Sequence, residues 1–493
     1  MSSKGGVLTE EQASALYDAG REAVVAVLVD FARRIQALEE QLAKNSSNSS
    51  KPPSSDGLKK PPLRPMNAVN AQSLRKKSGN KPGGQKGHPG STLEAVETPD
   101  EIVVHTPDTC QHCCGSLDKG VTTAVSRRQV FEMPEPKVVV TEYQIVTLCC
   151  PCCGKETQAS APTGVERPVQ YGPNLRGFAT YLHAVHLIPY ARCAQILRET
   201  TGAPFSAGSL HQAVRTAHIR LAEFDQALQK ALDNVDSVPV KYVDETGSRV
   251  AGKLHWFHVR CTEHLCRLFR HEKRGGDAVV ADLQAYRGTL VSDFWSSYVA
   301  LSSCRHVFCG AHVLRELTFV HEVQGQGWAR GLISVLEQAV SACHRARARG
   351  SKKVWNADRL AASYRFWVKQ GLLANAAPAN PIPTASPPRN PVNSPSNSNK
   401  ARCLAGRLWE RRDDYLRFLY DLTLPFTNNL SEQAIRMFKV KGKISGCFRT
   451  TSGADHFCRI RSYTATCQRQ RLSVLECLRS VFVGQITMPA FSA

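Results

Sequence analysis

The sequence lacks any apolar segment long enough to cross a membrane. Its most apolar early stretch, 23–32, is interrupted by Asp30 and is far shorter than the ~20 residues that a transmembrane helix needs. The N-terminus also lacks the basic region and apolar core of a signal peptide. We therefore expect a cytoplasmic protein with no membrane partner, whose cysteines are mostly thiols or metal ligands and not disulfides.

Acidic residues are also few. The chain has 42 Asp and Glu against 63 Lys and Arg, which gives a net charge of +21. This imbalance favours a polyanionic partner, because neutralising phosphates releases their condensed counterions. Since the membrane is disfavoured, nucleic acid is the expected partner. At roughly 150 residues per domain, a chain of 493 residues suggests about three folding units.

The N-terminal segment, 1–44, has a helical apolar pattern. Its apolar side chains are spaced 4, 3, 4, 3 and 4 residues apart, at Val24, Leu28, Phe31, Ile35, Leu38 and Leu42. This spacing is typical of the a/d seam of a coiled coil of about three heptads. It predicts a homo-oligomer formed through this helix; the alternative is an amphipathic helix packed on its own domain.

Residues 45–100 are polar and basic, and begin with NSSNSSKPPSSD at 45–56. Such a composition cannot bury a core, so we expect a flexible linker. Its glycines and cations would let it follow a phosphate backbone or a minor groove. The expected DNA contacts are Lys76, Lys77, Lys81 and Lys86; the alternative is a solvated tether.

Residues 101–165 contain two CxxC motifs, Cys110–Cys113 and Cys150–Cys153. Four thiolates suit a structural zinc ion, so we expect a zinc-binding domain with these four ligands. Residues 137–148 have a strand pattern that would return the second motif to the first. Three neighbouring cysteines leave the ligand choice open: Cys114, Cys149 and Cys152. The alternative is a set of buried thiols without metal.

Residues 166–236 have a helical pattern, with helices expected at 176–188 and 191–200 and a longer one from Ser209. Gly202 and Pro204 interrupt the pattern. A helix-turn-helix reader of DNA and an ordinary helical bundle are equally compatible with it.

Residues 237–312 read as an α/β core. Strands are expected at 238–250, 254–261, 265–271, 288–295 and 303–309, with a helix at 277–286 and another from Ala311. Three strands, a helix, a strand, a helix and a further strand form the order of a ribonuclease-H-like mixed sheet. In that topology the first and fourth strands are neighbours.

Two aspartates fall on these neighbouring strands. Asp244 lies in the middle of the first strand, and Asp293 lies toward the end of the fourth, 49 residues later. Two carboxylates brought together would oppose each other's ionisation unless cations lay between them. Two divalent ions about 4 Å apart would resolve this conflict and would promote phosphoryl transfer.

A third carboxylate is expected from the segment 427–493. Asn428 or Asn429 would cap a helix that carries Glu432 in its first turn. Three carboxylates and DNA phosphate oxygens suit two magnesium or manganese ions. Basic residues after Glu432 are expected to contact DNA phosphates: Lys439, Lys441, Lys443, Arg449, Arg459 and Arg461. Cys309 and His312 lie one helical turn apart and could bind metal, but such a pair is more often structural, and we assign it no catalytic role.

Between the core and this helix lies a helical insertion, 313–426. Its segment 374–400 is rich in Pro, Asn and Ser, and we expect it to be disordered. The chain is thus predicted to be multidomain, with the α/β core preceded by a coiled coil, a zinc-binding domain and a helical DNA-binding region.

At these residues the sequence resembles the insertion-sequence-66 family of bacterial transposases, of the DDE superfamily. The matching strings run through nearly the whole chain: NSSNSSKPPSSD at 45–56, GGQKGHPG at 83–90, the paired CxxC motifs, YVDETGSRV at 242–250, GTLVSDFWSSY at 288–298, CGAH at 309–312 and NNLSEQAIRMFKVKGKISGCFRTTSGA at 428–454. One departure is Thr427, where the family often has Asp.

The resemblance implies a ribonuclease-H-like fold, two metal ions and a catalytic triad of Asp244, Asp293 and Glu432. It implies binding of an element's terminal repeats and of target DNA, followed by cleavage and strand transfer, in the bacterial cytoplasm at the nucleoid. Small accessory proteins are further partners of such enzymes. Two alternatives remain: a catalytically inactive DNA-binding descendant, and a zinc-ribbon regulatory protein that oligomerises through its N-terminal helix.

Overall fold

A computed structural model of the chain describes residues 9–46, 48–49, 93–234, 238–276, 283–376 and 397–491. The predicted DNA contacts Lys76, Lys77, Lys81 and Lys86 lie outside these residues, and so does most of the predicted loop 374–400. The predicted helix at 277–286 is described only from residue 283. Within the described residues, no helix has the length and apolarity needed to cross a bilayer.

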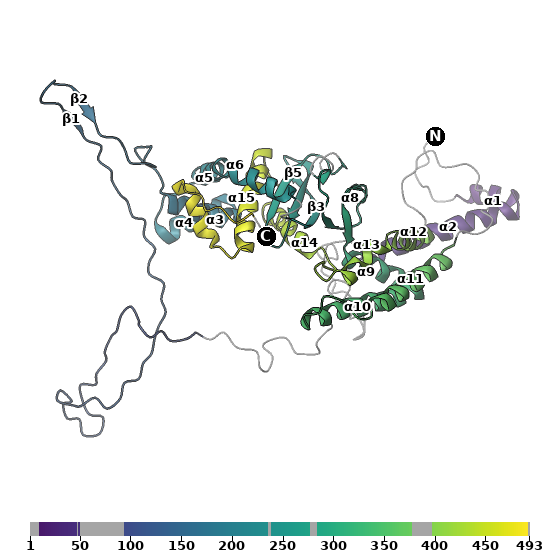
Figure 1. Cartoon of the computed structure of the whole chain (residues 1–493), viewed down its shortest axis with the longest axis horizontal. Helices are drawn as coiled ribbons and strands as arrows, with labels where there is room; N and C mark the ends of the chain where they lie inside the picture. The colour runs from purple at the N-terminus through teal and green to yellow at the C-terminus, as the bar shows by residue number, and fades with distance from the viewer. Residues whose placement is uncertain are drawn as a thin grey trace.

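A mixed five-stranded sheet lies at the centre of the molecule, in the order β5–β4–β3–β6–β7 (Figure 1). Its strands are β3 (Val240–Val250), β4 (Lys253–Cys261), β5 (Cys266–His271), β6 (Thr289–Ser292) and β7 (Arg305–Phe308). The first three pair antiparallel, and β6 and β7 extend the sheet from β3 in parallel. The five strands expected from the sequence are confirmed.

The pairing register of β3 and β6 aligns the two predicted aspartates. Tyr242 lies opposite Val291, and each pair in this ladder is separated by 49 positions in the sequence. Asp244 and Asp293 have this same separation. Continued two residues beyond the last pair, the register therefore places Asp293, at the end of β6, directly beside Asp244.

Two helices near the C-terminus cover the antiparallel half of the sheet. Helix α14 (Asn429–Ser445) packs across β3 and β4, where Phe438 stacks on Phe257 with 4.3 Å between ring centroids. Helix α15 (Thr451–Arg469) lies along the edge strand β5. Its Ser462 and Thr466 hydroxyls accept hydrogen bonds from the β5 backbone at 2.8 and 3.1 Å. These contacts satisfy an edge that would otherwise be open.

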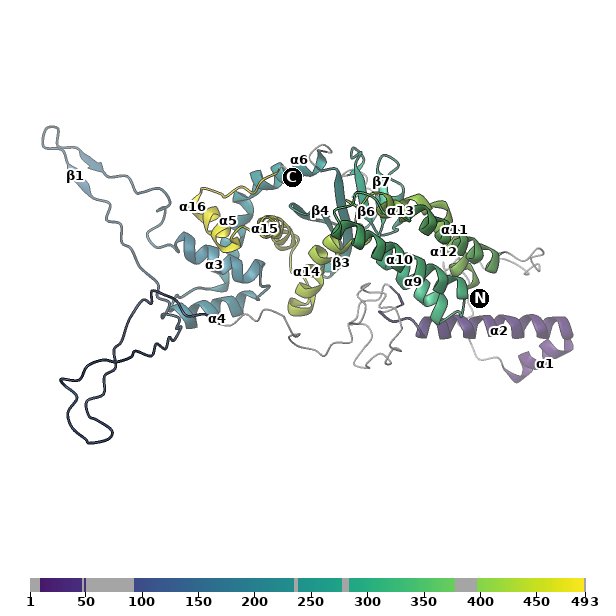
Figure 2. The same ribbon diagram turned by 60° about the horizontal axis from the view of Figure 1, so that its bottom comes forward.

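The insertion after β7 is helical, as expected. After the short helix α8 (Ser296–Val299) and strand β7 come α9 (Gly310–Glu322), α10 (Gly327–Ala348), α11 (Ala357–Ala374), α12 (Asn397–Glu410) and α13 (Arg412–Tyr420). Their buried side chains form one core with those of the sheet and α14. Figures 1 and 2 show this layer on the side of the sheet opposite to α3–α6.

The helical region before the sheet contains α3 (Pro173–Ala184), α4 (Tyr190–Thr201), α5 (Ala207–Arg220) and α6 (Ala222–Asp233). The longer helix expected from Ser209 is α5, which ends at Arg220; the chain leaves helical geometry at Leu221 (φ −83°, ψ 11°), and α6 follows. These helices share a core with α15 and α16 (Val474–Val483). The C-terminal segment therefore completes the region that precedes the sheet.

Residues 93–171 are extended and project away from the other elements (Figures 1 and 2). The predicted strand 137–148 is largely wrong: the structure has only β1 (Thr147–Cys149), paired antiparallel with β2 (Glu156–Gln158). Val139 and Val140 are exposed. Because no strand pairs with residues 137–146, the alternating pattern alone does not produce a strand there.

Two helices precede the linker, α1 (Glu10–Asp18) and α2 (Arg21–Leu42). Thr9 and Gln12 form a capping box at the start of α1. Helix α2 confirms the predicted helix, and its Leu28, Ile35 and Leu38 are exposed. The coiled coil itself needs a partner and stays a prediction.

Candidate metal centre and DNA-facing surface

The three predicted carboxylates come from the middle of β3, the residue after β6 and the start of α14. Asp244 Oδ1 accepts a hydrogen bond from the Glu245 amide (2.8 Å), and Asp293 Oδ1 accepts one from the Trp295 amide (3.2 Å). Glu432 lies in the first turn of α14. Its charge contributes to the environment of Asp244, together with the charge of Asp293. The charges of Asp293 and Glu432 therefore act on Asp244, although within the described residues the ligand atoms of these three carboxylates do not all lie within 4.8 Å of one another.

Asn428 fixes the start of α14 against the sheet. Its side-chain amide donates to the Val243 carbonyl at 2.7 Å, directly beside Asp244, and the residue is only 1% exposed. Ser431 lies against the same carbonyl, with Oγ at 3.5 Å. The capping role predicted for Asn428 or Asn429 is wrong in its detail. Asn428 occupies the N-cap position, but its side chain makes no capping hydrogen bond and instead joins helix to strand.

The environment disfavours ionisation of both aspartates. Burial contributes most to raising the pKa of Asp244 well above 3.8, and the charges of Glu245, Asp293 and Glu432 add to it. At Asp293 burial again contributes most to raising the pKa, followed by the charge of Glu245, while His312 lowers it. Cations among these carboxylates would remove the repulsion. The donor set is all oxygen, which fits hard divalent ions such as magnesium or manganese.

Glu245 is a fourth carboxylate of this region that the sequence did not reveal. Its carboxylate pairs with Arg274 at 2.9 Å and accepts a hydrogen bond from the Tyr298 hydroxyl at 2.7 Å. The Arg274 guanidinium lies 4.7 and 4.8 Å from the rings of Trp256 and Trp295. Glu245 thus has its own partners, which distinguishes it from Asp244. The sequence does not predict the Glu245–Arg274 ion pair, because strands β4 and β5 separate the two residues along the chain.

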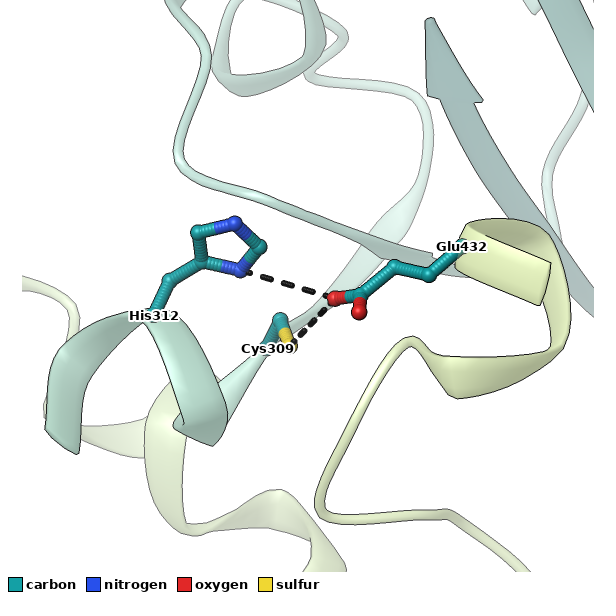
Figure 3. A group of neighbouring side chains, drawn as sticks. All are labelled: Cys309, His312 and Glu432. Atoms are coloured by element: carbon teal, nitrogen blue, oxygen red, sulfur yellow. Dashed lines mark hydrogen bonds and ion pairs between the residues drawn. The ribbon is translucent and has the colours of Figure 1, made fainter. Parts of the chain in front are cut away.

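Glu432 lies beside Cys309 and His312, the pair to which the sequence assigned no catalytic role. Cys309 Sγ donates to Glu432 Oε1 at 3.6 Å, and His312 Nδ1 lies 3.8 Å from the same oxygen (Figure 3). A cavity of about 220 Å³ opens beside them, lined also by Asp293 and Arg407. The cavity gives an ion or a phosphate access to Asp293.

The two CxxC motifs adopt the same local geometry. In each, the first cysteine's amide donates to the carbonyl five residues later, at 2.9 Å for Cys110 and 2.8 Å for Cys150. The amides of Cys114 and Gly154 donate back to the carbonyls of Cys110 and Cys150, each at 2.9 Å. Cys114 and Gly154 both have positive φ, 56° and 67°. Cys114 therefore corresponds to a turn glycine.

This equivalence favours Cys110, Cys113, Cys150 and Cys153 as the ligand set. Backbone amides, chiefly those of His112 and Cys153, lower the pKa of Cys110 and Cys150. Among the described residues, however, no three of these thiols lie within 4.8 Å of one another. A single site formed by both motifs stays a prediction.

The predicted DNA contacts after Glu432 divide into exposed and internal side chains. Lys439, Lys443 and Arg449 are exposed, and so is Arg436, which the sequence analysis missed. Lys441 is only 7% exposed, with its ammonium 5.5 and 5.3 Å from the rings of Phe448 and Phe457. Lys441 is thus directed into the protein and offers no surface to a phosphate.

Two further residues that were predicted to contact DNA, Arg459 and Arg461, instead form hydrogen bonds within the protein. The buried guanidinium of Arg461 donates to the carbonyls of Ala184 and Val185, at 3.4 and 3.3 Å. That of Arg459 donates to the carbonyl of His218 at 2.8 Å. Both arginines join α15 to the helices that precede the sheet.

The comparisons with known proteins agree with this arrangement. The chain has a mixed sheet, helices on both sides and a carboxylate cluster, as an α/β catalytic core has. The Transposase IS66 family matches residues 168–456, well over half of the chain, so the chain belongs to this family. A family of unknown function, DUF6444, matches residues 8–94. A search of curated proteins finds no match. Family membership makes the chain a transposase, with DNA as the expected partner and dependence on a divalent metal.

Proposed function

We propose that this transposase binds the terminal repeats of an insertion sequence and cleaves and joins DNA with Asp244, Asp293 and Glu432. The proposal is supported by the register of β3 and β6, which aligns Asp244 with Asp293, and by the effect of the Glu432 charge on Asp244. One carboxylate comes from β3, one from the end of β6, and one from a helix 139 residues further along the chain. The strand order and the mixed pairing support a ribonuclease-H-like core.

In this proposal the three carboxylates hold two magnesium or manganese ions. When bound, such ions activate the attacking water and stabilise charge on the phosphate. The chain's own contribution is positioning. β3 and β6 fix Asp244 and Asp293 side by side, and the Asn428–Val243 hydrogen bond fixes the first turn of α14 beside them. After cleavage, the freed 3′-hydroxyl would be held at the same carboxylates for attack on target DNA.

Helix α14 supports the proposal with a row of cations that leads away from Glu432. Arg436, Lys439 and Lys443 follow Glu432 at intervals of 4, 3 and 4 residues and are exposed. This spacing places them along one side of a helix. They span about 10 Å at 1.5 Å per residue, a length suited to successive phosphates of one strand. We assign this row, with Arg449, to the DNA backbone.

We assign supporting roles to the other regions. The two CxxC motifs would bind one structural zinc ion, and the helices α3–α6 would read the terminal repeats. Exposed apolar residues on α2, among them Leu28, Ile35 and Leu38, support self-association through a coiled coil. Small accessory proteins would complete the assembly on DNA.

A cleavage assay tests the proposal. DNA carrying the element's terminal repeats should be cut at the element end by the wild-type chain with magnesium, and not with a chelator present. Asp293→Asn and Glu432→Gln should bind the same DNA and leave it uncut. Cleavage by both variants at the wild-type rate would refute the assignment and would favour an inactive DNA-binding protein.

A further inference from the structure

Cys309, His312 and Glu432 form a compact group of three different metal-binding side chains (Figure 3). One ligand atom from each lies within 4.8 Å of the others. We propose that this group is a binding site for a thiophilic divalent cation of the zinc class, and that such an ion competes with magnesium for Glu432. The competition rests on the proposed function; the binding site does not.

The distances fit such an ion. Zinc binds sulfur at about 2.3 Å and nitrogen or oxygen at about 2.0 Å, so tetrahedral geometry separates the ligand atoms by roughly 3.3–3.6 Å. Cys309 Sγ lies 3.6 Å from Glu432 Oε1, and His312 Nδ1 lies 3.8 Å from it. These two separations exceed the tetrahedral values by about half an ångström or less, and all three ligand atoms lie within 4.8 Å of one another.

Backbone amides surround the Cys309 sulfur, while burial, the largest influence, raises the pKa of its thiol to about 12. The Asn428 amide donates to Cys309 Sγ at 3.2 Å, and the amides of Ala311 and His312 also act on it. Cys110 receives the same contacts from the amides two and three residues later, in His112 and Cys113. The Cys309–His312 turn thus has the amide-to-sulfur pattern of the CxxC motifs, with histidine as the second ligand.

His312 supplies a second, independent observation. Its Nδ1 is buried and has no hydrogen-bond partner among the described residues, although it points toward Glu432 (Figure 3). A buried nitrogen without a hydrogen bond is costly, and a cation between it and Glu432 would satisfy it. An imidazole and a thiolate select zinc and related ions over magnesium, which prefers oxygen.

Binding would change the state of both Cys309 and Glu432. The thiol must lose its proton to solvent as the sulfur–metal bond forms. Glu432 Oε1, which now accepts a hydrogen bond from that thiol, would become a ligand of the new ion. Glu432 would then be withdrawn from the carboxylate group that it forms with Asp244 and Asp293. Three protein ligands leave one coordination position for water.

Cobalt(II) provides a direct test, because thiolate-bound tetrahedral cobalt absorbs visible light. The full-length wild-type chain should bind one more equivalent of cobalt than Cys309→Ser or His312→Gln, and the difference spectrum should show sulfur-to-cobalt charge transfer. Cys343→Ser is the matched control. Cys343 is also buried and donates only to a backbone carbonyl, that of Phe418.

Equal cobalt binding by wild type, Cys309→Ser, His312→Gln and Cys343→Ser would overturn the site. Circular dichroism would establish that each variant folds. If Cys309→Ser does not fold, cobalt binding by His312→Gln is compared with that of the wild type instead. This substitution is less disruptive, because the His312 side chain is partly exposed and no buried thiol is altered.

The competition is measured separately, on magnesium-dependent DNA cleavage. Zinc should inhibit the wild type, and half-inhibition of Cys309→Ser should need at least about tenfold more zinc, because loss of a ligand weakens metal affinity by that much or more. Equal zinc sensitivity of both chains would overturn the competition. If no chain cleaves DNA, the proposed function fails, while the cobalt titration still decides the site.

Discussion

Two regions with metal-binding side chains are built in opposite ways. In residues 93–171, hydrogen bonds between neighbours form each CxxC turn, and most side chains are exposed. At the sheet, Asp244, Asp293 and Glu432 come from distant parts of the chain and are held by pairing, packing and the buried Asn428. The CxxC turns of residues 93–171 form from local hydrogen bonds and need no hydrophobic core. The carboxylate site at the sheet depends on the packed core around it.

This difference determines what a metal does in each place. A zinc ion shared by the CxxC motifs would supply folding energy to residues 93–171, as structural zinc does in small domains. At the sheet the fold is already packed, so divalent ions would mainly relieve repulsion among carboxylates.

The largest effect is expected from neutral substitutions of the carboxylate group. Asp244→Asn should lower the cleavage rate at least about 1000-fold, because several kcal/mol of charge stabilisation by bound ions is lost. Glu245→Gln should lower it less than about tenfold, since its partner Arg274 is partly exposed and can be solvated. Rates are measured on terminal-repeat DNA, with Asp413→Asn, on the exposed side of α13, as a control. An equal decrease in cleavage rate for Asp244→Asn and Glu245→Gln would contradict the different roles assigned to these two carboxylates.

Asn428 tests whether long-range contacts build the site. Asn428→Ala should lower the free energy of unfolding by about 1–3 kcal/mol, because the buried Val243 carbonyl loses a donor. Cleavage should fall as well, since Glu432 loses its anchor. The matched control is Asn429→Ala, at the exposed neighbouring position. Denaturant unfolding measures the difference, and similar stability of the two variants would contradict the role of the anchor.

Zinc should protect residues 93–171 and leave the sheet region unchanged. With zinc bound, trypsin should cut this segment at least about tenfold more slowly than after chelation, because metal binding is coupled to folding. Cys153→Ser should abolish the protection. Cys114→Ser should retain it, because Cys114 occupies the position of a turn glycine. Protection that depended on Cys114 would show that the ligand set is wrong.

A smaller effect is expected at the basic row of α14. Neutralising one phosphate contact reduces the slope of log affinity against log salt by about 0.9. Lys439→Ala should show this change. Lys353→Ala, an exposed lysine in the loop between α10 and α11, should not. Fluorescence anisotropy over a salt series measures both, and identical slopes would place the DNA on another surface.

The pH dependence of stability tests the carboxylates without DNA. The raised pKa values of Asp244 and Asp293 mean that the folded chain binds more protons than the unfolded chain above pH 3.8. Stability of the metal-free chain should therefore fall as pH rises through these pKa values. Asp293→Asn should weaken the dependence, and magnesium should oppose it. Thermal melts at several pH values would detect this. A profile unchanged by magnesium would argue against ions at this site.

The sequence predicted the sheet well, because its strands carry long alternating or apolar runs bounded by turns. From the order of elements it also predicted that the strands of Asp244 and Asp293 are neighbours, and β3 and β6 are paired with a register of 49 residues. It failed at residues 137–146, where a strand pattern has no partner to pair with. Lys441 was also misjudged: it lies in a basic run, but the helix directs it toward Phe448 and Phe457.

The sequence by itself therefore determined the chemistry of the parts. It supplied the carboxylates, the two CxxC turns, the heptad spacing of α2 and the basic segment after Glu432. Only the tertiary structure decided which of them meet. Asn428 joins α14 to β3, Glu245 is paired with Arg274, and Cys309 and His312 meet Glu432. These contacts connect residues that are far apart along the chain. They depend on helix packing and strand order, which no local pattern encodes.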